Sequence, residues 1–292
     1  MIALVTGASG GIGLELARLF AGDGHDLVLV ARGGERLTTI ARDFEDRFRV
    51  QVRTVPRDLS NPIAPLSLYD ECGEVDFLVN NAGFGHRGSF TDEDPVMLSE
   101  MLQVNVAAVT QLTRMFLPAM VERGSGRILN VASVDGVVIG VPNHAAYGTC
   151  KGALAGLTRE LAVEGAPDGI QVNALLPGAA TSHGMGAVEG KNYAPPINVA
   201  PAIVAPGACW LVHEECSATG RVFSCSSGRM AEVFTRPGAG WQGHPDDFDL
   251  EHVRANWQQI QSADGMADVH TIEAWNSFRT ELYNRMVESN SQ

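Results

Sequence analysis

The sequence is poor in cysteine and in basic residues. Five cysteines occur among 292 residues, an odd number, and no two of them form a C-x-x-C pair. A disulfide framework or a zinc site is therefore not expected, and reduced thiols in a cytosol are the simpler interpretation. The 21 Lys and Arg residues are outnumbered by 34 Asp and Glu, which leaves a net charge of −13. So acidic a chain is a poor candidate for binding nucleic acid and, more weakly, for binding an anionic membrane surface.

The sequence also has few long apolar runs and no internal repeats. We find no apolar stretch long enough to span a bilayer. The first residues enter an apolar strand pattern and a glycine turn at once, so we expect no signal peptide and a cytoplasmic location. The composition is 45% hydrophobic and 19% charged, and the chain is long enough to bury a substantial core in one large domain or two small ones.

Strand-like and helix-like patterns alternate from the first residue. The predicted strands are Ile2–Val5, Asp26–Ala31, Val50–Val55, Asp76–Asn80, Arg127–Val131, Ile170–Leu175 and Arg221–Cys225. Helical patterns are predicted over Ile12–Phe20, Glu35–Phe48, Pro95–Arg123, Ala145–Glu164 and Ala202–Val212. Alternation of this kind is typical of crossover connections between parallel strands. The sequence therefore predicts an α/β fold, a doubly wound parallel sheet of about seven strands with helices on both faces.

Two segments depart from this alternation. Residues 178–201 are rich in Gly, Ala and Pro without a clear period, which predicts a loop. Beyond Arg236, helical segments hold aromatic residues, so we expect this part to pack. We predict a main domain over residues 1–235, whose 178–201 loop covers the substrate, and a helical C-terminal extension over 236–292 that packs on the core.

A cluster of glycines, TGASGGIG, lies between the first predicted strand and helix. Glycines there permit a tight turn and the close approach of a pyrophosphate, which the free N–H groups of the helix N-terminus can bind. Glycines often serve only in turns, but the strand–loop–helix context favours a dinucleotide site. The predicted contacts are Gly7, Ser9, Gly11, Ile12 and Gly13.

The end of the second predicted strand indicates which dinucleotide binds. NAD sites usually place a carboxylate at this corner to hold the ribose hydroxyls, but the sequence has Arg32 there. A guanidinium makes bidentate, charge-assisted contacts with a phosphate, and the Ser9 hydroxyl could add to them. We therefore predict NADP(H) in preference to NAD(H). The alternative role for Arg32 is that of a solvated loop residue.

Tyr147 and Lys151 are four residues apart in AAYGTCKGAL and share one face of a predicted helix. The ammonium favours the phenolate, so we expect a lowered pKa for the phenol. Such a phenol can give a proton to, or take one from, a carbonyl or alcohol oxygen. With a dinucleotide site nearby, the pair predicts hydride transfer.

Together these motifs resemble the classical short-chain dehydrogenase/reductase family over roughly Ile2 to Cys225. Three more segments are similar to that family in its order: Asp58-Leu59, Asn80 to Gly83 (NNAG) and Asn173 to Gly178 (NALLPG). The resemblance implies a Rossmann-type fold and a homodimer or homotetramer. The catalytic tetrad it implies is Asn105, Ser133, Tyr147 and Lys151. The further cofactor contacts it implies are Asp58, Leu59, Asn81, Ala82, Gly83, Tyr147, Lys151, Pro177, Gly178 and Thr181.

In such a site Tyr147 would exchange the proton and Lys151 would hold the nicotinamide ribose. Ser133 would hydrogen-bond the substrate oxygen, and Asn105 would hold a water of a proton relay. One departure from the family is that Ser133 lies one residue further before Tyr147 than is common. The segments HEECSATGRVFS and PGAGW also resemble a branch that includes the hydroxyacyl-CoA dehydrogenase units of multifunctional β-oxidation enzymes.

The resemblance implies an NADP(H)-preferring oxidoreductase that interconverts a ketone and a secondary alcohol. The C-terminal tail and the branch resemblance favour a bulky, apolar substrate. Three alternatives stay open: a catalytically silent NADP(H) sensor or scaffold, a hydroxyacyl-CoA dehydrogenase-like enzyme, and an epimerase or dehydratase on the same fold. No metal site, nucleic acid or membrane partner is expected, and His86 and His144 are interpreted as bystanders near the pocket.

Overall fold

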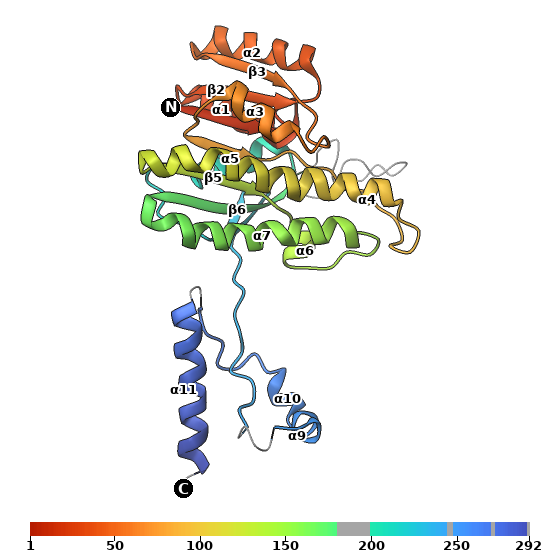
Figure 1. Ribbon diagram of the computed structural model, residues 1–292, viewed down its shortest axis with the longest axis vertical. Helices are drawn as coiled ribbons and strands as arrows, with labels where there is room; N and C mark the ends of the chain where they lie inside the picture. The colour runs from red at the N-terminus through yellow and green to blue at the C-terminus, as the bar shows by residue number, and fades with distance from the viewer. Residues whose placement is uncertain (180–198, 244–247, 270–271, 291–292) are drawn as a thin grey trace. The chain divides into compact units, whose positions relative to one another are not determined.

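The computed structural model describes residues 1–179, 199–243, 248–269 and 272–290. These residues form two compact units, Met1–Val233 and Phe234–Gln292 (Figure 1). Thr181 and most of the 178–201 loop lie outside the described residues. The assignment of a main domain over 1–235, with a packed extension over 236–292, stays a prediction.

The first unit is built on one sheet with the strand order β3-β2-β1-β4-β5-β6-β7-β8. Its strands are β1 Ile2–Thr6, β2 Asp26–Ala31, β3 Val52–Pro56, β4 Phe77–Asn80, β5 Gly126–Val131, β6 Ile170–Gly178, β7 Val222–Ser226 and β8 Arg229–Glu232. β1 to β7 pair in parallel, which confirms the predicted doubly wound sheet.

The strand count is eight in the described residues, rather than about seven, because β8 pairs antiparallel with β7. The two strands are joined by Ser227 and Gly228, whose φ angles are 52° and 80°. Positive φ at both central residues is typical of the two-residue hairpin turn that matches strand twist. Nothing in the apolar pattern of Arg229–Glu232 marks it as a strand, so the sequence-based prediction missed it.

Helices cover both faces of this sheet. α1 Gly11–Gly22, α2 Gly34–Phe48 and α8 Pro201–Trp210 share one apolar core with side chains such as Leu16, Phe44 and Val204. α3 Ala64–Cys72, α5 Ala108–Arg123 and α7 Ala145–Gly165 cover the other face. Because side chains alternate across a strand, Ala3 and Val5 of β1 enter the first core and Leu4 enters the second.

One long helix runs from α4 Pro95–Leu102 through a π-helical turn, η1 Gln103–Ala107, into α5. By length and composition alone, residues 95–123 could cross a membrane, which corrects the expectation that no segment reaches that length. Its side chains Leu112, Phe116 and Met120 are instead buried against the sheet and α3. We therefore interpret it as a core helix of the first unit.

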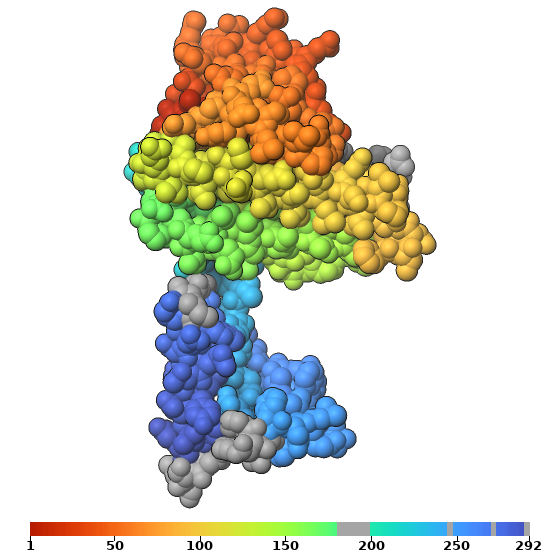
Figure 2. Space-filling model, in the orientation of Figure 1, coloured from red at the N-terminus to blue at the C-terminus, as the bar shows by residue number. Residues whose placement is uncertain are grey.

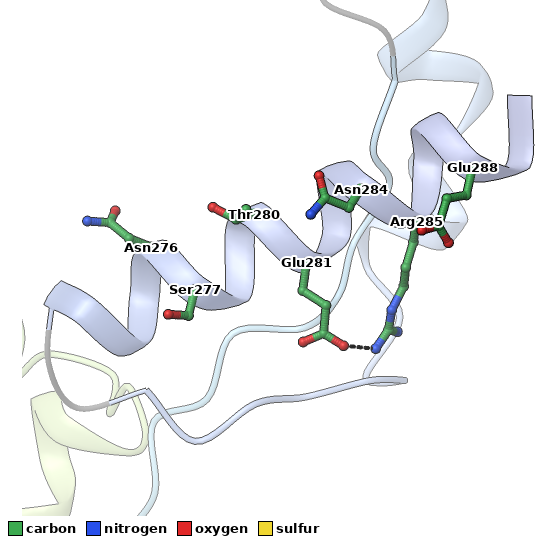
Figure 3. A pocket seen from close by; sticks show the side chains of 7 residues that line it. All are labelled: Asn276, Ser277, Thr280, Glu281, Asn284, Arg285 and Glu288. Carbon is green, nitrogen blue, oxygen red and sulfur yellow. Dashed lines mark hydrogen bonds and ion pairs between the residues drawn. The ribbon is translucent and has the colours of Figure 1, made fainter. Parts of the chain in front are cut away.

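The second unit contains α9 Leu250–Ala255, α10 Trp257–Ile260 and α11 Ile272–Asn290. The Trp241 ring stacks on Phe248, with ring centroids 5.6 Å apart. Along α11, polar side chains line a shallow, open hollow, and Glu281 pairs with Arg285 across one turn (Figure 3). None of the predicted catalytic residues lines this hollow, so it is not the candidate site.

Candidate active site

The glycine-rich turn joins β1 to α1 in a conformation that only glycine tolerates well. Gly7 has a φ of 68°. A Cβ on Gly13 would lie 2.5 Å from the Gly7 carbonyl oxygen and 2.5 Å from Asn81 Nδ2. No side chain caps the N-terminus of α1, so its N–H groups stay available to an anion. This corner can accept a pyrophosphate.

The segment after β4 is hydrogen-bonded to the same corner. Thr6 Oγ1 accepts from the backbone N–H groups of Asn81 and Ala82, at 3.0 and 2.9 Å. Asn81 also donates from Nδ2 to the Thr6 carbonyl oxygen at 2.8 Å. The predicted contacts Asn81 and Ala82 are therefore held beside the glycine turn by a hydroxyl that the sequence analysis had not singled out.

Two arginines lie at the end of β2. Arg32 follows this strand and is exposed. Arg36, in the first turn of α2, donates from Nε to the backbone oxygen of Ser9. Sequence reasoning missed Arg36, although its spacing of four residues from Arg32 was a usable signal. Arg36 thereby contacts the glycine-rich turn, and Arg32 lies exposed at the end of the same strand.

The adenine side of the predicted site follows β3. Asp58 is exposed and accepts from the Ser60 N–H at 3.0 Å, while Leu59 is buried. At the other side, Pro177 and Gly178 end β6. β3 and β6 lie on opposite sides of β1 and β4 in the sheet. Because these strands are parallel, the residues at their carboxyl ends lie along one edge of the sheet, and the predicted contacts follow that edge.

Tyr147 and Lys151 lie one turn apart on α7, as predicted. Lys151 is 4% exposed, and its Nζ donates to the Val131 carbonyl oxygen at 2.9 Å. The same nitrogen lies 5.8 Å from the centroid of the Tyr147 ring. Burial lowers the pKa of Lys151 from 10.5 to about 8.

The prediction that the pKa of Tyr147 is lowered is wrong, because the pKa is raised in the protein without other molecules bound. Burial raises the pKa of Tyr147, a hydrogen bond with the Ser133 hydroxyl lowers it in part, and the Asp135 charge raises it further. The physical reason is that the phenol is desolvated while the Lys151 ammonium donates to Val131 rather than to the phenol. Spacing along a helix placed both groups correctly but did not determine where the ammonium points.

Asn105 is fully buried in the π-helical turn, which excludes the alternative of a polar surface position. Its Nδ2 donates to the carbonyl oxygens of Phe84 and Met101, at 2.8 and 3.0 Å. Its Oδ1 is buried and has no hydrogen-bond partner among the residues that the structure describes. An orphaned buried acceptor can hold a water, and π turns are frequent at functional sites.

The segment after β4 lies against three of the four predicted catalytic residues, Asn105, Tyr147 and Lys151. A Cβ on Gly83 would lie 2.5 Å from Asn105 Oδ1 and 3.1 Å from Lys151 Nζ, and one on Gly85 would lie 2.8 Å from the Tyr147 ring. Ser133 follows β5, and its hydroxyl caps α6 Val134–Val137 by accepting from the Asp135 N–H at 3.2 Å. The side chains thus converge at the carboxyl ends of β4 and β5.

His144, interpreted from the sequence as a bystander, contacts Tyr147 edge to face with ring centroids 5.8 Å apart. The sequence signal for this contact was the position of His144, three residues before Tyr147. His86 instead pairs with Glu93. Among the described residues, no three His, Cys, Asp or Glu side chains are grouped so as to hold a metal ion.

The fold and this site define a dinucleotide-binding α/β oxidoreductase. Residues 1–192 match a family model described as short chain dehydrogenase, and the chain belongs to that family. It is accordingly an NAD(P)-dependent short-chain dehydrogenase/reductase that acts on CH–OH groups. The resemblance stated from the motifs is confirmed.

Similar proteins agree with this assignment. Oxidoreductase UcpA of Salmonella typhimurium is 38% identical over 179 residues, 60% of this chain and 68% of that protein. Galactitol 2-dehydrogenase (L-tagatose-forming) of Cereibacter sphaeroides is 36% identical over 177 residues, 60% of this chain and 70% of that protein. A short-chain dehydrogenase from Sphingobium yanoikuyae, solved in complex with NADPH, has a TM-score of 0.67 and 32% identity over 71% of this chain and 82% of that chain.

A structural likeness also includes the second unit. The full-length peroxisomal multifunctional enzyme type 2 from Drosophila melanogaster aligns over 98% of this chain and 49% of that chain. The TM-score is 0.81 and the sequence identity is 22%. At that identity the likeness concerns the fold alone.

Proposed function

We propose that this protein interconverts a ketone and a secondary alcohol, with NADP(H) as the preferred cofactor and Tyr147 as the general acid and base. One observation carries the proposal: the Nζ of the buried Lys151 lies 5.8 Å from the centroid of the Tyr147 ring, at the carboxyl ends of the parallel strands. This edge is where ligands bind in open α/β sheets.

The glycine-rich corner fits a dinucleotide because Gly13 has no room for a side chain and α1 has no side-chain cap. NADP(H) supplies or accepts the hydride when bound. Lys151 uses one N–H on Val131 and retains donors for ribose hydroxyls. Ser133 stabilises charge on the substrate oxygen, and Tyr147 gives that oxygen a proton in reduction and takes it in oxidation.

Turnover of a ketone panel tests the activity. Loss of NADPH absorbance with at least one ketone is expected, and Tyr147→Phe should lower kcat by about a hundredfold or more. Tyr283→Phe, on α11, is the matched control and should equal the wild type. Tight NADPH binding without any turnover would instead support a silent sensor or scaffold, and a non-redox product identified by NMR would support an epimerase or dehydratase.

The NADP(H) preference is supported by Arg32 and Arg36, which follow β2, and by Ser9 in the glycine-rich turn, whose backbone oxygen accepts from Arg36. Replacing Arg32 by Asp should raise KM for NADPH about ten- to a hundredfold, since a charge-assisted contact to phosphate is replaced by repulsion. KM for NADH should change much less. Equal effects on both cofactors would contradict the preference.

Substrate size and assembly complete the proposal. The C-terminal unit and the branch resemblance support a bulky, apolar substrate, so the ketone panel includes an aromatic ketone and a ketoacyl thioester. A dominant rate with the thioester would favour the hydroxyacyl-CoA dehydrogenase-like alternative.

The continuous face formed by α5 and α7 (Figure 2) supports a homodimer or homotetramer. The five free thiols support a cytoplasmic location. Light scattering after gel filtration tests the assembly.

A further inference from the structure

Three side chains outside the predicted catalytic set form a hydrogen-bonded chain at the edge of the site. Arg87, in the segment between β4 and α4, donates from Nε to Nε2 of His144 at 2.6 Å. Nδ1 of His144 lies 2.6 Å from Oδ2 of Asp135, which belongs to α6. Residues from three separate segments are thereby connected in one line.

The chemistry of these groups fixes where the protons lie. A guanidinium carries donors only, so Nε2 of His144 accepts and carries no proton. The proton of a neutral imidazole is then on Nδ1 and donates to the Asp135 carboxylate. Asp135 is 6% exposed, and a buried carboxylate without such a donor would be costly. Arg87 therefore favours one tautomer and one orientation of the His144 ring.

His144 is coupled to Tyr147 in two ways. Its ring meets the Tyr147 ring at 70°. Its carbonyl oxygen accepts from the Gly148 N–H at 2.7 Å, so its backbone also begins the helix that bears Tyr147. Movement of His144 would therefore move both the ring and the start of α7.

The charged and titratable groups around His144 come from each element packed on it. They are Asp135 from α6, Arg87 from the segment after β4, and Tyr147 from α7. Beside Arg87, His86 Nδ1 lies 2.9 Å from Glu93 Oε1, which leaves Arg87 for His144. The Gly88 N–H also donates to the Asn143 carbonyl oxygen at 3.1 Å, and this bond ties the same two segments together.

We propose that Arg87 is a positioning residue that locks His144 in its neutral Nδ1–H tautomer, so that His144 holds the Asp135 carboxylate and the Tyr147 ring in fixed places. The catalytic importance of Tyr147 in this statement rests on the proposed function. Without Arg87, Nε2 is free to take a proton, and the resulting imidazolium offsets the Asp135 charge beside the phenol. Loss of Arg87 therefore makes the site newly sensitive to acid.

The tautomer is tested without any substrate, by ¹⁵N NMR of the histidine side chains in the full chain. The His144 signals are those missing from the spectrum of His144→Gln. At neutral pH we expect an unprotonated Nε2 in the wild type, because Arg87 donates to it, and an Nε2 that gains a proton in Arg87→Met. A protonated Nε2 in the wild type, or an unprotonated one throughout in Arg87→Met, overturns the proposal.

Turnover tests the effect on Tyr147. Arg87→Met should lower kcat about tenfold, because small displacements of catalytic groups are costly, and should leave KM for NADP(H) unchanged. It should also add a loss of activity on the acid side of the pH profile. The double variant Arg87→Met/His144→Gln should lack that added loss, because an amide does not titrate.

Arg42→Met, at an exposed position on α2, is the control and should match the wild type in both readouts. A pH profile of Arg87→Met that superimposes on the wild type overturns the positioning role. A protein that reduces no ketone would contradict the proposed function, whereas the NMR result would still decide whether Arg87 locks His144.

Discussion

Lys151 holds its ammonium group where water hardly reaches it. The lysine is 4% exposed, and its one hydrogen-bond partner among the described residues is the Val131 carbonyl oxygen. A charge in such a place lowers the stability of the folded chain. In the proposed site, the donors that Val131 leaves free would hold the ribose hydroxyls of the cofactor.

The pKa shift of Lys151 predicts how stability depends on pH. Burial lowers the pKa from 10.5 to about 8, so between these values the unfolded chain holds a proton that the folded chain has lost. The cost of burying the charge is therefore complete below about pH 8 and disappears as pH rises toward 10.5. Relative to Lys151→Met, the wild type should gain free energy of unfolding over this range, about 1.4 kcal/mol for each unit of pKa shift. Urea unfolding at several pH values measures the difference, and parallel curves would contradict it.

At the scale of elements, the start of α7 depends on the short segment after β5. Gly136 has a φ of 81°, and a Cβ there would overlap the carbonyl oxygen of Gly148. The contact lets α6 pack directly on the helix that carries Tyr147. Only glycine combines the left-handed backbone with so close an approach.

Gly136→Ala should therefore destabilise the protein by about 3 kcal/mol or more and lower turnover, because α7 must move. Gly140→Ala is the matched control, since a Cβ at Gly140 has no neighbour within 4 Å, and its effect should stay within about 0.5 kcal/mol. Urea midpoints and ketone turnover measure both variants. Similar losses for the two alanines would show that the contact is unimportant.

At the scale of the whole molecule, the two units differ in how much core they contain. The first unit pairs all eight strands within residues 1–233. In the described part of the second unit, Met286 is the one buried large hydrophobic residue, while Phe248, Leu250 and Trp257 are more than half exposed. A unit with so little buried apolar surface gains little from folding alone.

The isolated segment 234–292 should show no cooperative thermal transition, whereas 1–233 should unfold cooperatively and still bind NADP(H). Circular dichroism during heating and NADPH titration measure the two properties. A sharp transition in the isolated segment would contradict the prediction. Loss of turnover in 1–233 with bulky ketones but not small ones would support a substrate role for the second unit.

The sequence by itself determined the doubly wound sheet, the glycine turn and the pairing of Tyr147 with Lys151. These features follow from local patterns, because apolar alternation, strand–turn–helix context and i,i+4 spacing act within a few residues. The same patterns missed β8, since a two-residue turn and a short edge strand leave little apolar signal.

Only the tertiary structure decided the surroundings of the predicted residues. Arg87, Asp135 and His144 come from separate segments, and no spacing along the chain joins them. The Lys151 ammonium is directed at the carbonyl oxygen of Val131, a strand residue twenty positions away. The pKa of Tyr147 is raised chiefly because the phenol is buried. Hydrogen bonds and desolvation act across space, so they exist only once the sheet has brought these segments together.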